Sequence, residues 1–196
     1  LLNIGFVSPG PATWPHYDGF MKLVPDFVKF DFQGLGLFGQ SLYEIIGKKQ
    51  EVVRRVSEHA MEKKWHAVIL IGAPTEVMNP GLFAALKAAL QIPVTTALAA
   101  SVHALRHYGA TRLLLLTPFE TRLNGMIEEY LTEAGFSVNA PKSFANIGEA
   151  GRLGKVERLK AVRPFGRQRA GEGFVKHIAL LRSPPRSSSF ARRRGS

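Results

Sequence analysis

The 196-residue sequence contains no cysteine. This absence excludes disulfide bonds, thiolate metal sites and a cysteine nucleophile. The sequence also lacks an apolar run long enough to span a bilayer, so we expect no association with a membrane. Residues 1–7 have the pattern of a strand and lack the basic region and cleavage site of a signal peptide. We therefore expect a cytoplasmic protein.

Acidic residues are scarce only at the C-terminal end of the chain. The net charge is +11, yet residues 1–150 contain 13 basic and 13 acidic side chains. Residues 151–196 contain 13 basic side chains and only two acidic ones. The folded body thus has no charge excess with which to attract a polyanion. We therefore do not expect nucleic acid to be the partner, and the least favoured alternative is that nucleic acid binds through the basic C-terminal tail.

The segment 156–196 is rich in arginine, serine, proline and glycine and shows neither helix nor strand periodicity. This composition is typical of disorder. We predict that the segment is a disordered or non-native tail, of the kind that a shifted reading frame of a GC-rich gene would encode.

Strand and helix patterns alternate through the rest of the chain. Strands are predicted at 3–7, within 29–36, at 68–71, 92–96 and 112–116, and from 136, with helices at 41–64, 81–90, 97–108 and 118–134. This alternation predicts an α/β fold with a parallel sheet and helices on both faces.

Three of the predicted helices carry capping signals at their starts. Ser41 and Glu44 have the spacing of a capping box, and so do Thr117 and Glu120. Asn79 has the residue type of an N-cap, with a proline at the first helical position after it.

The stretch 68–80 is the centre of the expected site. In open α/β sheets, ligands bind beyond the carboxyl ends of the strands, and a helix N-terminus there favours an anion. Two further strands end in a small residue followed by proline, at 8–9 and at 117–118, as the central strand does at 73–74. We expect these three loops to surround one pocket, although such a pair is also an ordinary way to end a strand.

Residues 3 to about 153 resemble the Asp/Glu racemase superfamily, and within it most closely the arylmalonate decarboxylases and the maleate cis-trans isomerases. The resemblance rests on several pieces in a consistent order, at 4–9, 70–75, 93–97, 104–112 and 115–119 and at Asn124. It implies two pseudo-symmetric halves. We place a flavodoxin-like first half at 3–96, within about 1–100, and the start of an incomplete second half at 97–155.

The resemblance also implies a function. Members of the superfamily carry out carbanion chemistry, without a cofactor or metal, at a carbon next to a carboxylate. The implied activity is that of a decarboxylase, isomerase or racemase acting on a small mono- or dicarboxylate of the arylmalonate, maleate or aspartate kind. The implied substrate-binding residues are Ser8, Pro9, Gly72, Ala73, Pro74, Thr75, Thr117 and Phe119.

The chain departs from the catalytic pattern of these families. Racemases use one cysteine from each half, whereas arylmalonate decarboxylases keep the second cysteine and have glycine at the first position. The first position falls here at Gly72 or Ala73, and nothing in the sequence replaces the second cysteine. The catalytic residues therefore stay unassigned. The chain is either an enzyme, active or inactive, or a non-catalytic carboxylate-binding protein on the same scaffold.

Several polar residues have a structural interpretation beside the functional one. Ser8 suits a turn or a ligand donor equally well, and Thr117 suits a helix cap. Glu76 is interpreted as a solvated loop charge rather than a base, and His16 as a residue of a surface loop. Because the second half lacks strands that would cover its sheet edge, we also expect self-association into a homo-oligomer.

Overall fold

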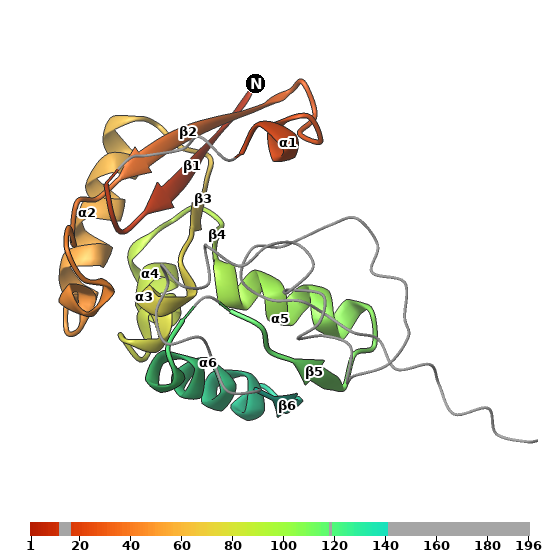
Figure 1. Cartoon of the computed structure of the whole chain (residues 1–196). Helices are drawn as coiled ribbons and strands as arrows, with labels where there is room; N and C mark the ends of the chain where they lie inside the picture. Colours follow the sequence, from red (N-terminus) through yellow and green to blue (C-terminus); the bar gives the residue numbers. More distant parts are fainter. Residues whose placement is uncertain (12–16, 118, 141–196) are drawn as a thin grey trace, which may run out of the picture.

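Two parallel sheets form the framework of the protein in a computed structural model, which describes residues 1–11, 17–117 and 119–140 (Figure 1). The larger sheet has the order β2-β1-β3-β4, and the smaller sheet pairs β5 with β6. The predicted parallel α/β fold is confirmed. The six strands are β1 (Leu2–Ser8), β2 (Val28–Gly34), β3 (Ala67–Leu70), β4 (Val94–Thr96), β5 (Arg112–Leu114) and β6 (Ser137–Asn139).

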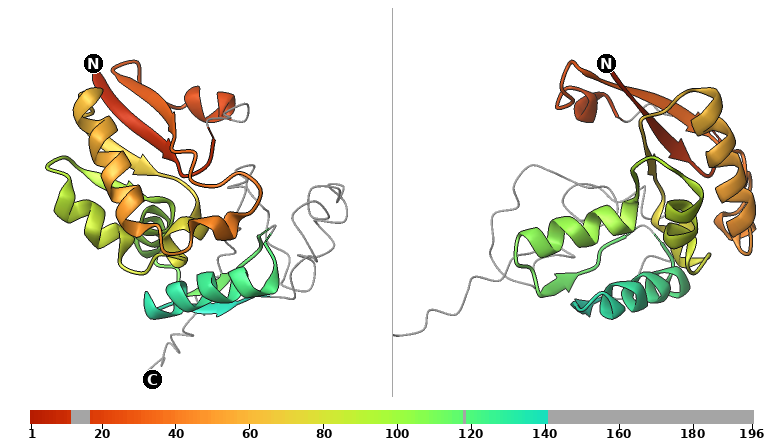
Figure 2. Two further views of the ribbon diagram at one scale, coloured as in Figure 1. Left: turned by 90° about the vertical axis from the view of Figure 1, so that its left-hand side faces the viewer. Right: turned by 180° about the vertical axis from the view of Figure 1, so that it is seen from behind.

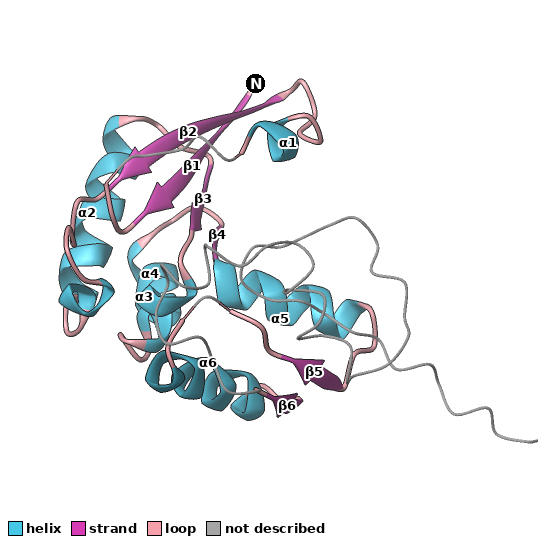
Figure 3. Ribbon diagram, viewed as in Figure 1, coloured by secondary structure: helices cyan, strands magenta, loops and turns pink. Residues whose placement is uncertain are grey.

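The helices cover the larger sheet from both sides. Figures 1 and 3 show α2 and α4 on one side of it, with α1 and α5 on the other. Figure 2 shows α2 beside α4, in agreement with their contacts. The helices are α1 (Asp18–Met21), the 3-10 helix η1 (Leu42–Ile45), α2 (Lys49–Glu62), α3 (Ala73–Val77), α4 (Leu82–Ala89), α5 (Ala97–His107) and α6 (Thr121–Glu133). No helix in the described ranges is long and apolar enough to cross a membrane.

The strand order places a topological switch point between β1 and β3. From β1 the chain moves outward to β2, and it then returns to the other side of β1 to form β3 and β4. Val7 of β1 is paired with Leu70 of β3, and the Ile71 N–H donates to the Val7 carbonyl at 2.8 Å. The loops that leave β1 and β3 therefore diverge from neighbouring points, where open α/β folds bind their ligands.

A close contact between Gly5 and Trp65 fixes the middle of β1 against the chain that enters β3. The Trp65 side chain is buried, and its indole N–H donates to Asp31 Oδ2 at 2.9 Å. A Cβ at Gly5 would lie 2.3 Å from Cε3 of this ring, well inside contact distance. Only glycine leaves room for the indole at this position.

The prediction of one helix over 41–64 is wrong. The capping box of Ser41 and Glu44 is present with both of its hydrogen bonds, but it opens only the single turn η1. Gly47 then adopts a left-handed conformation with φ of 72°, and α2 begins at Lys49. The apolar periodicity continues across the break, because Ile45, Val52 and Val56 are all buried, so periodicity alone does not reveal it.

The predicted cap at Asn79 is also wrong. Residues 73–77, predicted as loop, form α3, and α4 begins at Leu82 after Gly81 with φ of 78°. The buried Asn79 side chain instead donates to the carbonyls of Ile45 and Thr75, at 3.0 and 2.9 Å. An asparagine side chain can donate to carbonyls through its amide nitrogen or cap a helix through its oxygen. The tertiary packing around Asn79 determines that it donates to carbonyls.

The second predicted capping box, at Thr117 and Glu120, does not form. Glu120 occupies the N-cap position of α6 itself and makes no side-chain capping bond. Its carboxylate accepts a hydrogen bond from the Tyr43 hydroxyl instead. The proline predicted at the first helical position, Pro118, lies outside the described residues, as do His16 and the segment 156–196.

Replacing Gly5 with alanine should destabilise the protein, because the buried indole cannot move without losing its core contacts. We expect a loss of about 1–3 kcal/mol in the free energy of unfolding, measured by urea denaturation. Gly125→Ala is the matched control. It lies within α6 with no atom near the added Cβ, and it should stabilise the helix by roughly 0.5–1 kcal/mol. Equal midpoints for Gly5→Ala and the unaltered protein would contradict the account.

Candidate functional site

A pocket lies at the switch point, between the loops that follow β1 and β3. Its cavity volume is about 90 Å³. The residues that line it are Ser8, Pro9, Phe38, Leu42, Ile45, Ile71, Gly72, Pro74 and Thr75. Most of these side chains are apolar, so the few polar groups act in surroundings of low polarity.

Two hydroxyl groups supply the polar side chains of the pocket. Ser8 Oγ accepts a hydrogen bond from the Gly10 N–H at 3.2 Å, which leaves its own hydrogen available to donate. Thr75 is almost fully buried, and its Oγ1 lies beside Gly72 in the pocket lining. Both hydroxyls therefore border the cavity, where a hydroxyl can donate to a ligand oxygen. For Ser8 the structure shows the turn bond and leaves the donor role open, so the two interpretations are compatible.

Gly72 lines the pocket beside the Thr75 hydroxyl. Its φ is 94°, a conformation that residues with a side chain rarely adopt. A Cβ at this position would lie 3.4 Å from Thr75 Oγ1 and 3.6 Å from the Pro9 ring. A side chain at position 72 would therefore enter the pocket. Among the described residues, the backbone N–H groups of Gly72 and Ala73 find no acceptor.

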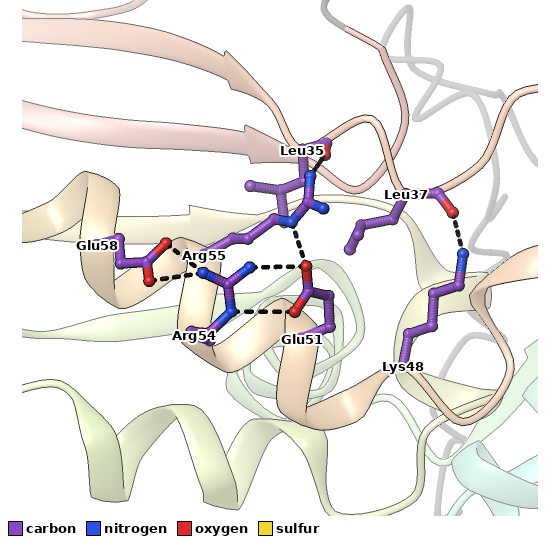
Figure 4. Close-up of polar contacts among 7 residues, drawn as sticks. All are labelled: Leu35, Leu37, Lys48, Glu51, Arg54, Arg55 and Glu58. Carbon is purple, nitrogen blue, oxygen red and sulfur yellow. Dashed lines mark hydrogen bonds and ion pairs between the residues drawn. The ribbon is translucent and has the colours of Figure 1, made fainter.

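The loop after β2 contributes Phe38 to the apolar wall, and two basic side chains, one at the N-cap of α2 and one within α2, hold this loop in place (Figure 4). Lys48 Nζ donates to the Leu37 carbonyl and Arg55 Nη1 to the Leu35 carbonyl, each at 2.6 Å. Leu35 and Leu37 are buried. The ring of Phe38, in the same loop, packs over Gly10, which follows β1. The two cations thus fix the segment that presents Phe38 to the pocket.

Acidic side chains on α2 orient Arg55 and its neighbour Arg54. Glu51 accepts hydrogen bonds from both Arg54 and Arg55, and Arg54 also binds Glu58, as Figure 4 shows. The two guanidinium groups lower the pKa of Glu51 to about 2. The network is exposed, so its contribution to stability is small, but it restricts Arg55 to the direction of the Leu35 carbonyl.

The structure brings together five of the eight residues predicted to bind substrate. Ser8, Pro9, Gly72, Pro74 and Thr75 line the pocket. Ala73 is buried at the start of α3 and does not line it. Thr117 and Phe119 also lie outside the pocket lining.

Thr117 and Phe119 belong to a second buried polar cluster, at the start of α6. Thr117 Oγ1 accepts from the Phe119 N–H at 3.0 Å and is hydrogen-bonded to the Asn124 side chain. Asn124 Nδ2 in turn donates to the Phe119 carbonyl at 3.2 Å. Within the described residues these groups satisfy one another, so the cluster organises the turn into α6.

Phe38, Leu42 and Ile45 are pocket residues that sequence reasoning missed. Ile45 lies within the single helix predicted over 41–64, and the break at Gly47 places it in the separate turn η1 beside the pocket. Phe38 lies in a glycine-rich loop with no periodicity. No local signal distinguishes an apolar wall of this kind from ordinary core.

Glu76 is buried rather than solvated, so its interpretation as an exposed loop charge is wrong. Only 6% of the residue is exposed, and it does not line the pocket. Oε1 accepts from the Tyr130 hydroxyl at 2.9 Å, while the buried Oε2 has no hydrogen-bond partner among the described residues. Burial raises the pKa of Glu76, and the hydroxyls of Thr96 and Tyr130 oppose this with smaller effects. The Thr96 hydroxyl affects the pKa of Glu76 by lying near its carboxyl group, without a hydrogen bond of normal geometry between them.

The described residues contain no group of three or more histidine, cysteine, aspartate or glutamate side chains suited to hold a metal ion. The pocket lining has neither a carboxylate nor an imidazole within this part of the chain. What the arrangement offers chemically is neutral hydrogen-bond donation to a small anion beside an apolar wall.

The buried carboxyl of Glu76 predicts a pH dependence of stability. Its pKa is raised, so the folded state binds the proton more tightly than the unfolded chain. The resulting stabilisation is complete below the unfolded pKa of about 4.5 and is lost as the pH rises through the folded-state pKa. Glu76→Gln, which has no carboxyl to ionise, should therefore gain stability relative to the unaltered protein as the pH rises.

Urea unfolding at a series of pH values tests this difference. Glu129→Gln, on the exposed side of α6, is the control and should keep the pH dependence of the unaltered protein. Glu44 and Glu51 have lowered pKa values, so they titrate below the pH range in which Glu76 loses its proton. Parallel stability curves for Glu76→Gln and the unaltered protein would refute the assignment.

Comparison with known proteins identifies the family. A sequence model described as arylmalonate decarboxylase matches residues 4–169, whereas no curated protein matches the chain. The solved structure of unliganded arylmalonate decarboxylase is similar, with a TM-score of 0.63 and 25% identity over 84% of this chain and 72% of that one.

Two isomerase structures share the fold. One is a cysteine-to-serine mutant of the Nocardia farcinica maleate cis-trans isomerase with a covalently bound succinylcysteine intermediate. It has a TM-score of 0.62 and 20% identity over 84% of this chain and 73% of that one. The other is a Pseudomonas putida maleate isomerase with maleate, at a TM-score of 0.56 and 16% identity over 85% and 73%. Because the family match covers most of the sequence, the chain belongs to the arylmalonate decarboxylase family.

Proposed function

We propose that the pocket at the ends of β1 and β3 binds the carboxylate of a small malonate- or maleate-like acid. The proposed activity is cofactor-independent decarboxylation or isomerisation at the carbon next to that carboxylate. One observation carries the proposal. The hydroxyls of Ser8 and Thr75 come together at the switch point, beside an apolar wall, with the N–H of Gly72, which has no acceptor within the described part of the chain.

Neutral donors suit the charge that develops in this chemistry. When a malonate-type acid loses CO₂, the carbon–carbon bond to one carboxylate breaks. Its electron pair remains on the substrate as an enediolate, whose oxygens gain negative charge. Donors fixed at those oxygens stabilise the transition state more than the ground state. The apolar wall strengthens each of these hydrogen bonds by excluding water.

The volume of the pocket limits what enters it. A cavity of about 90 Å³ suits a carboxylate with its neighbouring carbon rather than a whole drug-sized ligand. Phe38, Leu42 and Ile45 face that volume and would contact an apolar substituent on the acid. The proposed substrate is therefore a small carboxylate, with its charged end at Gly72.

Completing the reaction requires a proton at the carbanionic carbon. The Nocardia farcinica isomerase described above holds its intermediate on a cysteine, and this sequence has none. The described pocket residues offer only hydroxyls, whose pKa is far above neutrality. The proton donor is thus the unassigned part of the proposed mechanism.

The absence of cysteine favours a second candidate function, a non-catalytic carboxylate-binding protein on the same scaffold. Incubation in D₂O with phenylmalonate, maleate or aspartate separates the two. NMR would detect CO₂ loss, isomerisation or deuterium next to the carboxylate if the chain is an enzyme. Binding without any of these changes would establish the second function, and absence of binding would reject both.

Replacing Gly72 with alanine should weaken carboxylate binding, because the methyl group would enter the pocket between Pro9 and Thr75. We expect at least about a tenfold loss of affinity for phenylmalonate, equivalent to roughly 1.4 kcal/mol, by titration calorimetry. Gly109→Ala is the matched control, since Gly109 also has a positive φ, of 63°, but faces open space. Retained affinity in Gly72→Ala would exclude this pocket as the binding site.

A further inference from the structure

The two segments that form opposite sides of the pocket are both tied to one helix of the second half. η1 contributes Leu42 and Ile45 to the lining, and α3 contributes Pro74 and Thr75. Each segment is only one or two turns long and cannot hold its own position. Each contacts α6 through a tyrosine–glutamate hydrogen bond.

The first bond lies at the start of α6. The Tyr43 hydroxyl, on η1, donates to Glu120 Oε1 at the N-cap of α6. The Arg122 guanidinium lies 5.0 Å from the centre of the Tyr43 ring. Burial and the Glu120 carboxylate raise the pKa of Tyr43 to about 12, which keeps the hydroxyl protonated as a donor at physiological pH.

The second bond lies near the other end of α6, with the two residue types exchanged. The Tyr130 hydroxyl, on α6, donates to Glu76 Oε1 on α3 at 2.9 Å. Glu76 directly follows the pocket residue Thr75 in sequence. It faces Tyr130 from α6 and Thr96 from the start of α5, and it forms no ion pair within the described residues. Arg106 of α5 acts on Tyr130 and lowers its pKa, against the larger opposite effects of burial and Glu76.

We propose that α6 positions the pocket from the second half, through the Tyr43–Glu120 bond to η1 and the Tyr130–Glu76 bond to α3. The four side chains are positioning residues, because none of them lines the cavity. This inference rests on the proposed carboxylate-binding function and extends it. The pocket lies in the first half, but its shape depends on how α6 is docked.

The buried carboxyl makes the docking of α3 on α6 sensitive to pH. Within the described residues, Glu76 Oε2 has no hydrogen-bond partner and no cation pairs with the carboxylate, so ionisation of Glu76 in this position is unfavourable. The Tyr130 hydrogen bond favours the ionised form, but burial has the larger effect, so raising the pH weakens the docking of α3 on α6. Glu76→Gln keeps an oxygen that accepts from Tyr130 and removes the ionisation, so it should preserve binding at high pH.

Hydrogen exchange in the ligand-free, full-length protein tests the positioning directly. Tyr130→Phe and Tyr43→Phe each remove one hydroxyl and leave the ring. Tyr130→Phe should speed exchange of the α3 amides, and Tyr43→Phe that of the η1 amides, by about tenfold, while other helices stay protected. Tyr108→Phe, with an exposed side chain, is the control. Unchanged exchange, or a uniform rise over all elements, would overturn the proposal.

Titration calorimetry with phenylmalonate and with maleate then tests whether the two tyrosine–glutamate bonds affect ligand binding. Tyr130→Phe and Tyr43→Phe should each weaken binding about tenfold, and Tyr108→Phe should not. The affinity ratio of Glu76→Gln to the unaltered protein should increase with pH, and this ratio cancels the ionisation of the ligand itself. A constant ratio would overturn the role of Glu76.

The two proposals fail in distinguishable ways. If the unaltered protein binds neither acid, the proposed function fails, and the exchange pattern still decides whether α6 positions η1 and α3. If it binds and the tyrosine variants bind equally well with unchanged exchange, the function stands and the positioning role is rejected.

Discussion

The pairing of β1 with β3 is the constraint on which the rest of the structure depends. Hydrogen bonds along this pair, which end with the Ile71 N–H to the Val7 carbonyl, place two diverging loops at adjacent points. Because β2 lies on the far side of β1, nothing in the sheet fills the space between them. The pocket is thus a consequence of strand order, and Ser8 and Gly72 both line it because β1 and β3 end at adjacent points.

The loops themselves are held by side chains from other elements. Lys48, the N-cap residue of α2, and Arg55 of α2 bind the carbonyls of the loop after β2. The Asn79 amide binds carbonyls of both η1 and α3. These bonds tie backbone oxygens of the loop and of the two short helices to side chains of other segments. Together with the tyrosine–glutamate bonds to α6, they give short segments the fixed positions that a binding site requires.

Membership of the arylmalonate decarboxylase family and the absence of cysteine bear on different parts of the chemistry. Binding a carboxylate and stabilising an enediolate require donors at fixed positions, and backbone N–H groups and hydroxyls supply them without a thiol. Delivering a proton to carbon requires an acid of suitable pKa. The first requirement is met by residues that the structure places in the pocket, while the second has no candidate in the pocket lining within the described residues.

The sequence by itself determined the strand and helix alternation, the glycine-and-proline strand ends and the resemblance to the family, because these depend on local periodicity and on motif order. Tertiary structure decided what individual polar residues do. Asn79 and Glu120 have good capping chemistry, yet distant partners, a carbonyl of Ile45 and the hydroxyl of Tyr43, bind them instead. Glu76 resembles a loop charge and becomes a buried carboxyl because α5 and α6 pack over it. A polar side chain bonds whatever group the fold brings nearest, and that group is set by contacts between residues far apart in sequence.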